Sequence, residues 1–380
     1  MKSKTYNILY AILIYCTSFV LTPQSYVYPI ILLLGLWQFL KSINYSLKKE
    51  DLLLLIGFLI SVLVFIFGYK YAINEDSKSI LNTYVPYTLL IVSIVFFSRN
   101  LNREIIYYLF FLLLFEIGVG IIEFVLGIPY IFVPNAGIGE TEYGSTGLLY
   151  FNRVFGLSSA VSVFAQKVLI SLVLLHYLDF SIKFRRIILV FLIVGFLVSF
   201  NRTAIVSGAV FILFYYFRKI NLKRITIGII GLIALVSLAL ANLEIIIEQF
   251  FRGKTEIDYS GRDNIFDFFS NFIKENPLWG NYIQKLWYKP TANELYHAHN
   301  TYLETVASTG IVVSFFLFSF IFFTAKRRKT FLYISPFLIY SMSQFGFFWG
   351  ISLLDIIFFY LLQVGVKNQS NSHLNLRKQI

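Results

Sequence analysis

The residues best suited to chemistry lie in segment 296–304, which reads YHAHNTYLE. It holds His297 and His299, two of the four histidines in 380 residues. An imidazole near its pKa at neutral pH can act as a general base or bind a metal. Residues at i and i+2 do not share a helix face, and no HExxH or CxxC pattern lies nearby. We therefore expect no metal and no other cofactor, with His299 as the candidate base and Glu304 as an alternative to it.

The composition indicates which class of protein carries this segment. Hydrophobic residues make up 58% of the chain and charged residues 14%, with a mean hydropathy of +0.73. A soluble domain carries about 25% charged residues. The formal charge of +12 comes from basic residues in short clusters between apolar runs, which is typical of polytopic membrane proteins. We expect membrane lipids as partners and no nucleic acid.

Apolar runs long enough to cross a membrane occur throughout the chain. A transmembrane helix needs about 20 such residues. The sequence therefore predicts an all-α polytopic membrane protein with about 12 transmembrane helices and a long extracytoplasmic loop, containing amphipathic helices, between spans 9 and 10. The expected spans are residues 6–22, 26–40, 51–69, 80–98, 104–127, 160–178, 186–201, 203–217, 224–242, 298–324, 330–347 and 350–366.

The loop charges predict the orientation of these spans. Most of the 32 basic residues fall in alternate connections, which makes both termini cytoplasmic. Residues 1–366 then form a single transmembrane domain that includes the outer loop 243–297, and residues 367–380 form a cytoplasmic tail. Segment 296–304 faces outward, where there is no pool of ATP or sugar nucleotides. A transferase working there must take its activated group from a carrier already in the membrane.

Ionisable residues inside spans are costly and mark candidate functional positions. Five such residues stand out in this sequence. Most are expected in the outer half of the membrane, around a cavity open to the outside. Glu123 and Lys167 could form a structural ion pair, and Arg202 could reach the lipid headgroups or bind a phosphate. These residues are Glu116, Glu123, Lys167, Arg202 and Asp355.

The outer loop contains one amphipathic segment. Ser260 and Asp263 are spaced as a capping box, and apolar residues follow at helical spacing until Pro277 ends the run. The helix should lie on the membrane surface or cap the bundle. Arg262 stands at its start, where the helix N-terminus favours anions and where a guanidinium can bind phosphate oxygens in pairs.

Several short motifs then resemble one family. They are Gly261-Arg262, Asn276-Pro277-Leu278-Trp279-Gly280, His299-Asn300-Thr301-Tyr302-Leu303-Glu304, Gly310-Ile311 and the hairpin Asn201-Arg202-Thr203-Ala204. Together, over about residues 195–325, they resemble the outer-loop signature of O-antigen polymerases and O-antigen ligases. In the hairpin, Asn stands where Ser is commoner.

The resemblance implies a metal-independent, inverting glycosyl transfer in the bacterial cytoplasmic (inner) membrane. The donor would be an undecaprenyl-diphosphate-linked oligosaccharide, and a chain-length regulator and a flippase of the same pathway would be partners. Arg202 and Arg262 would bind the diphosphate, with Arg153 and Lys167 as further candidates for the same anion. His299 would assist the acceptor hydroxyl, with Glu304 and Glu123 as alternatives.

Three functions remain open at this point. The first is a repeat-unit polymerase for O-antigen, capsule or another exopolysaccharide, which transfers a glycan to a sugar on another lipid-linked repeat. The second is a ligase that transfers the glycan to lipid A core. The third is a lipid-linked oligosaccharide flippase or other transporter, which twelve spans would suit. A transporter would be expected to show internal repeats, and no convincing repeat is visible.

Overall fold

The computed structural model describes most of the chain as helix. The described residues are 2–45, 47–73, 87–128, 154–217, 262–291, 294–344, 346–348 and 350–364, with the single residues 131, 226, 237 and 240. Within them, the β-structure consists of one isolated antiparallel bridge between Tyr288 and Tyr296. The ninth expected span, 224–242, lies almost wholly outside the described residues, and Arg153 and Ser260 lie outside them too.

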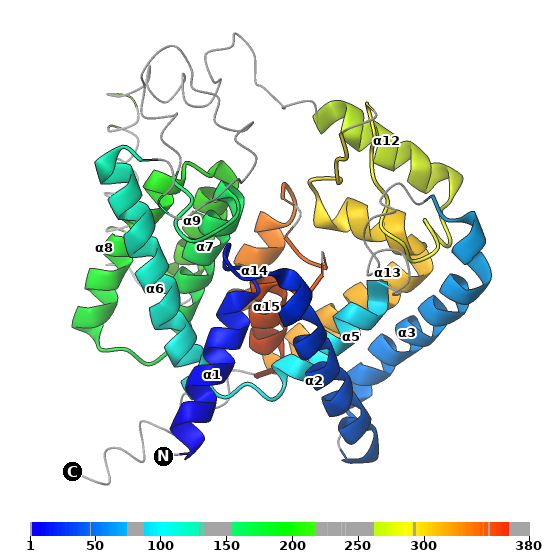
Figure 1. Ribbon diagram of the computed structural model, residues 1–380, viewed down its shortest axis with the longest axis horizontal. Helices are drawn as coiled ribbons and strands as arrows, with labels where there is room; N and C mark the ends of the chain where they lie inside the picture. The colour runs from blue at the N-terminus through cyan, green and yellow to red at the C-terminus, as the bar shows by residue number, and fades with distance from the viewer. Residues whose placement is uncertain are drawn as a thin grey trace.

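The described helices follow the expected spans closely (Figure 1). They are α1 (Lys2–Cys16), α2 (Gln24–Tyr45), α3 (Lys49–Gly68), the 3-10 turn η1 (Tyr69–Tyr71), α5 (Tyr87–Ser98), α6 (Arg103–Leu126), α7 (Val161–Tyr177), α8 (Ile182–Ser199), α9 (Arg202–Phe217), α12 (Arg262–Glu275), α13 (Thr301–Arg328), α14 (Phe331–Tyr340) and α15 (Leu353–Val364).

Four helical segments are long and apolar enough to cross a membrane: Ser25–Ile43, Lys49–Tyr71, Arg103–Leu126 and Thr301–Arg328. Shorter apolar helices accompany them, among them Val161–Tyr177 and Arg202–Phe217. The prediction of an all-helical membrane protein is therefore confirmed for the described residues, and the count of twelve spans stays a prediction.

Helices α1, α14 and α15 are shorter than the expected spans. The hydroxyls of Thr17 and Ser18 donate to the carbonyls of Ile14 (2.7 Å) and Tyr15 (3.1 Å), which closes α1 at Cys16 rather than at residue 22. At the other end of the chain, α14 stops at Tyr340 and α15 begins at Leu353. A connection over residues 341–352 replaces the tight hairpin expected around Gly350.

The connections expected on the cytoplasmic side lie together. Salt bridges join Arg99 to Asp51, Arg327 to Glu50, and Arg103 to Asp179, the last at 2.6 Å. In Figure 1 the N-terminus lies at the bottom of the view, and α12 lies at the top, on the opposite side of the bundle. Segments that charge alone assigns to one side of the membrane are thus neighbours in space.

Helix α13 is broken at Gly310, where φ is +75° and the helical hydrogen bonds are interrupted. Segment 277–283 packs into the break and supplies new partners. The amide of Ile311 donates to the carbonyl of Pro277 (2.9 Å), and the carbonyl of Ala307 accepts from the amide of Asn281 (2.8 Å). Such irregular backbone is tolerated within a membrane protein where it is buried and satisfied by protein.

Helix α12 caps the bundle. Its apolar face, which includes Ile265, Phe269 and Phe272, is buried in a small core with Ala298 and Ala307. The helix contacts α13 directly. The apolar face of this amphipathic helix thus packs against the start of α13, and the placement of the outer loop relative to the membrane stays a prediction.

Candidate functional site

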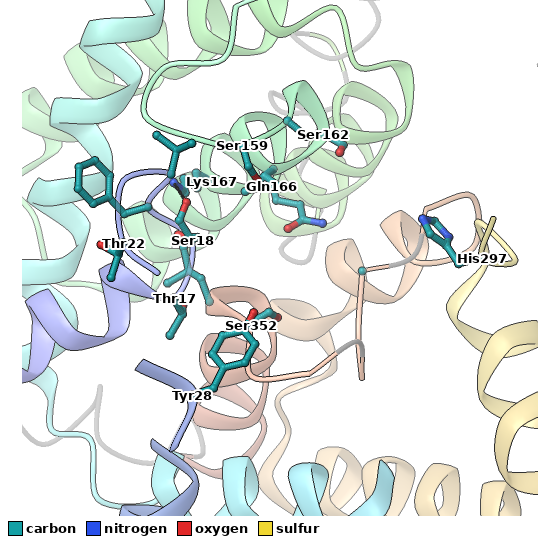
Figure 2. A pocket seen from close by; sticks show the side chains of 16 residues that line it. Thr17, Ser18, Thr22, Tyr28, Ser159, Ser162, Gln166, Lys167, His297 and Ser352 are labelled. Atoms are coloured by element: carbon teal, nitrogen blue, oxygen red, sulfur yellow. Dashed lines mark hydrogen bonds between the residues drawn. The ribbon is translucent and has the colours of Figure 1, made fainter. Parts of the chain in front are cut away.

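A cavity of ≈ 460 Å³ opens between segments that are far apart in sequence. Its walls are the α1–α2 connection, the start of α2, the first two turns of α7, the 341–352 connection and the 296–304 segment. Figure 2 shows the lining side chains converging from these elements. Each wall is an end of a span that the loop charges assign to the outer side. The lining residues are Thr17, Ser18, Phe19, Val20, Thr22, Tyr28, Ser159, Ala160, Ser162, Val163, Gln166, Lys167, His297, Gly346, Ser352 and Leu353.

A buried ion pair forms one wall of the cavity. The Lys167 amine lies 2.8 Å from the carboxylate of Glu116, and both side chains are fully buried. Lys167 also donates to the carbonyl of Ser18 (2.9 Å), while Tyr15 (2.7 Å) and Ser158 (2.6 Å) donate to Glu116. The cluster ties α1, α6 and α7 together.

This arrangement corrects the pairing expected from the sequence, because Lys167 pairs with Glu116 and not with Glu123. Glu123 accepts instead from the backbone amides of Ile131 (2.9 Å), Phe155 (3.1 Å) and Gly156 (2.7 Å). Glu116 lies about 10 Å, or seven residues, before Glu123 on α6. The sequence alone does not decide which of the two carboxylates pairs with Lys167, because this depends on how far α6 and α7 are shifted along each other.

The segments that carry the two candidate phosphate-binding arginines meet at Ser343. The Arg262 guanidinium donates to the Ser343 carbonyl (3.3 Å). The hydroxyl of Thr203, next to Arg202 at the tip of the α8–α9 hairpin, lies 3.1 Å from the Ser343 hydroxyl. The start of α12 and the hairpin, about sixty residues apart in sequence, therefore meet on the 341–352 connection.

The two histidines lie beside this junction. Their rings are 4.1 Å apart between centroids, and the Nδ1 of His297 accepts from the amide of His299 (3.1 Å). His299 has a left-handed backbone, with φ of +50°, which is a strained conformation that often marks a functional position. Its Nδ1 is buried without a hydrogen-bond partner among the described residues.

Both imidazoles are held neutral. Burial, reinforced by the positive charge of Arg262, lowers the pKa of His299 from 6.5 to about 4. Burial first, and then neighbouring positive groups that include Arg262, lower the pKa of His297 to about 3. The effect of Arg262 on both rings indicates that a cationic group stands near them. A neutral imidazole can accept a proton.

Glu304 supports the histidine segment from below. Its buried carboxylate accepts from the amide of Ala298 (2.9 Å), the residue between the two histidines. The neighbouring Asn300 caps α13 and also donates to the carbonyl of Met342 (2.8 Å). The Thr301 hydroxyl accepts from the amides of Gly346 (3.0 Å) and Phe347 (3.2 Å). The histidines and the 341–352 connection are thus one hydrogen-bonded unit.

The structure brings most of the expected site residues into one region. Lys167 and His297 line the cavity, Arg262, His299 and Glu304 lie around the junction beside it, and Arg202 is next to Thr203, which contacts Ser343 there. Arg153 lies outside the described residues, so its predicted role stays a prediction. Within the described part of the chain, no group of three or more His, Cys, Asp or Glu residues could hold a metal ion.

Sequence reasoning missed several residues of this region. Ser343 joins the segments that carry the two arginines, Tyr340 donates to the carbonyl of Ser162 (3.1 Å), and Tyr28 faces the cavity from α2. None of them belongs to a motif. The signal that could have found them is a gathering of hydroxyl residues at the outer ends of the first, second, sixth and eleventh spans.

Comparison with known proteins supports the expected resemblance. Residues 187–318 match a family model described as O-Antigen ligase. The matched stretch includes most of α8, all of α9 and α12 and more than half of α13, and with them Arg202, Arg262, His297, His299 and Glu304. The cavity walls from α1, α2 and α7 lie outside it. A comparison with curated proteins gives no match.

Proposed function

We propose that the chain belongs to the O-antigen ligase and polymerase superfamily, whose family model its residues 187–318 match, and that it is a polysaccharide repeat-unit polymerase. It transfers a growing glycan from undecaprenyl diphosphate to a sugar hydroxyl on another lipid-linked repeat. The proposal includes twelve spans, both termini in the cytoplasm of a bacterial cell, and a site that faces outward.

One observation carries this proposal: two arginine-bearing segments converge on Ser343 next to neutral histidines. A diphosphate brings several negative oxygens, which guanidinium groups bind well. Arg262 and Arg202 hold the donor diphosphate in this proposal. They also stabilise the charge that develops on it as it leaves, which is usually a large contribution to catalysis.

The reaction is a single displacement at the anomeric carbon of the donor. A bond forms between the acceptor hydroxyl oxygen and that carbon, and the bond from that carbon to the diphosphate oxygen breaks. The acceptor proton passes to neutral His299, and undecaprenyl diphosphate leaves with the bonding electrons. Attack from the opposite face inverts the anomeric centre.

The atom of His299 that takes the proton can be inferred from its surroundings. Its Nδ1 is covered by protein, so Nε2 is the nitrogen that a substrate hydroxyl can reach. Glu304 and Lys167 take supporting roles in this scheme. Glu304 holds the backbone of the histidine segment, and the charge of Lys167 is matched by Glu116.

The second candidate is an O-antigen ligase, which would use the same donor and transfer the glycan to lipid A core. The family model itself carries the ligase description, so this candidate has direct support. A flippase is less well supported, because transport does not require two arginines and two neutral histidines at one outer end of the bundle.

Deletion of the gene, followed by gel sizing of the glycans, separates these candidates. We expect single repeats on the acceptor lipid, as a lost polymerase leaves them. Long chains that accumulate on the carrier would identify a ligase instead, and lipid-linked repeats trapped in the inner leaflet would identify a flippase. Product formation that persists in the presence of a chelator would support metal independence. Loss of product formation in the chelator, restored by added zinc, would contradict it.

A further inference from the structure

We propose that the ≈ 460 Å³ cavity is a binding subsite for neutral glycan, distinct from the position of the diphosphate. The inference rests on the proposed function, and it identifies which part of the substrate this wall of the site recognises. Most of its lining residues come from the α1–α2 connection, α2 and the start of α7, which lie outside the stretch that matches the family model. Ligand cavities in proteins are commonly about 300–1,000 Å³, so the space is large enough for a short stretch of oligosaccharide.

The charge balance of the cavity separates it from the diphosphate position. Among the described lining residues, Lys167 is the one with a charged side chain, and Glu116 neutralises it at 2.8 Å. A buried ion pair offers no net charge to an anion. Arg262 and Arg202 are not among the lining residues; Arg262 donates to Ser343, and Thr203, next to Arg202, contacts the same residue. The cavity therefore suits an uncharged ligand, and the junction suits the anion.

The hydroxyl groups of the lining fall into two sets. Those of Thr17, Ser18 and Ser352 are already used within the protein, on Ile14, Tyr15 and Asp355 respectively. Within the described part of the chain, no protein acceptor or donor engages the second set, although these residues line the cavity. This second set is Thr22, Tyr28, Ser159 and Ser162.

The second set converges on one space from three elements. Thr22 lies in the α1–α2 connection, Tyr28 on α2, and Ser159 and Ser162 at the start of α7 (Figure 2). Gln166 follows Ser162 on the same face of α7 at i+4, and it adds an amide to the lining. Hydroxyl and amide groups both donate and accept, as the hydroxyls of a sugar do. Tyr28 adds an aromatic ring, against which an apolar sugar face can pack.

Binding of two separate probes to the purified full-length protein tests this assignment. The first probe is the free repeat-unit oligosaccharide, released by mild acid from the lipid-linked donor of the producing strain. The second is undecaprenyl diphosphate without glycan. The variants are Tyr28→Phe, Thr22→Val and Ser162→Ala, each of which removes a hydroxyl and keeps the shape of the side chain nearly unchanged. Tyr26→Phe is the matched control, because Tyr26 is on the same helix and 72% exposed.

We expect each variant to weaken oligosaccharide binding by about five- to tenfold, the usual effect of one lost hydrogen bond. Binding of undecaprenyl diphosphate should stay within about twofold of wild type, which also shows that the variants fold. Tyr26→Phe should change neither. Unchanged oligosaccharide affinity in all three variants would overturn the subsite, and so would the absence of any oligosaccharide binding by the wild-type protein.

Arg262→Ala makes failure of the subsite distinguishable from failure of the proposed function. This substitution should weaken the binding of undecaprenyl diphosphate and leave the binding of the oligosaccharide unchanged. If the diphosphate affinity is unchanged while the hydroxyl variants still lose oligosaccharide, the diphosphate site is wrong and the glycan subsite stands. Competition with intact lipid-linked oligosaccharide ties the subsite to the substrate, because donor and acceptor of the proposed polymerase both carry this glycan. Displacement of the free oligosaccharide is expected, and simultaneous binding of the two would contradict a substrate subsite.

Discussion

At the residue scale, the central group is a histidine kept neutral by its surroundings. The pKa of His299 is lowered to about 4, chiefly by burial and then by Arg262, so its basic form dominates above pH 4. Protons bind the unfolded chain more readily than the folded one between about pH 6.5 and 4. This group therefore stabilises the fold less as pH falls through that range.

The pH profile of the reaction follows from this position. We expect kcat/KM, which reports the free enzyme, to stay level from pH 8 to about pH 5 and then to fall. A bound diphosphate favours the imidazolium, so the acidic limb of kcat should lie at higher pH. His299→Ala should lower kcat by about 10²- to 10⁴-fold and remove the limb. If the acidic limbs of kcat and of kcat/KM lay at the same pH, this result would argue against a diphosphate beside His299.

The role of Arg262 can be separated from that of a simple positive charge. Arg262→Ala should reduce product formation by about 100-fold or more, and Arg262→Lys should recover only a small part, because lysine cannot bind oxygens in pairs. Initial rates with lipid-linked donor in detergent measure both. Lys274→Ala is the control, since Lys274 lies at the opposite end of α12. Full recovery of product formation in Arg262→Lys would mean that Arg262 acts only through its positive charge.

At the element scale, the site depends on the junction between segment 277–283 and the break in α13. A Cβ at Gly310 would lie 2.1 Å from the carbonyl oxygen of Leu278, and one at Gly280 would lie 2.4 Å from that of Ala307. The motifs around these glycines are separated by about thirty residues. Their contact explains why both occur in the resemblance that the sequence shows.

Gly310→Ala and Gly280→Ala should therefore destabilise the protein. Each combines a steric clash with a left-handed backbone, whose cost alone is of order 1–3 kcal/mol. The expected result is a lower melting temperature in detergent and lower activity. Gly118→Ala on α6 is the control, because its Cβ would meet only Phe191, at 3.8 Å. A melting temperature equal to that of the control would contradict the close packing of segment 277–283 against the break in α13.

The Glu116–Lys167 pair joins three helices, and its role can be tested by neutralising it. Glu116→Gln or Lys167→Met alone leaves a buried charge unpaired, which typically costs about 3–5 kcal/mol. Both single variants should accumulate poorly in membranes. The double variant should recover both protein level and polymer formation. Normal levels without activity would mean that Lys167 binds the substrate after all.

At the scale of the whole molecule, the sidedness that the loop charges indicate stays a prediction, while helix positions could be predicted because apolar runs are local signals. The pairing of Lys167 with Glu116 could not, since it depends on how far α6 and α7 are shifted along each other. A cavity open to the outside could be expected, but its lining could not be predicted. It is built from Tyr28, Ser162 and their neighbours, which are ordinary residues until α1, α2 and α7 bring them together. The arginines and His299 were found because short motifs surround them.

The most direct test of the whole account is polymerisation by the purified protein in lipid. The donor is undecaprenyl-diphosphate-linked repeat from the producing strain, with no nucleotide sugar and no other protein present. We predict chains longer than one repeat, with release of undecaprenyl diphosphate, from wild-type protein and neither from Arg262→Ala. Single repeats that persist unchanged with wild-type protein, while a lipid A core acceptor added to the same mixture becomes glycosylated, would contradict the assignment as a polymerase.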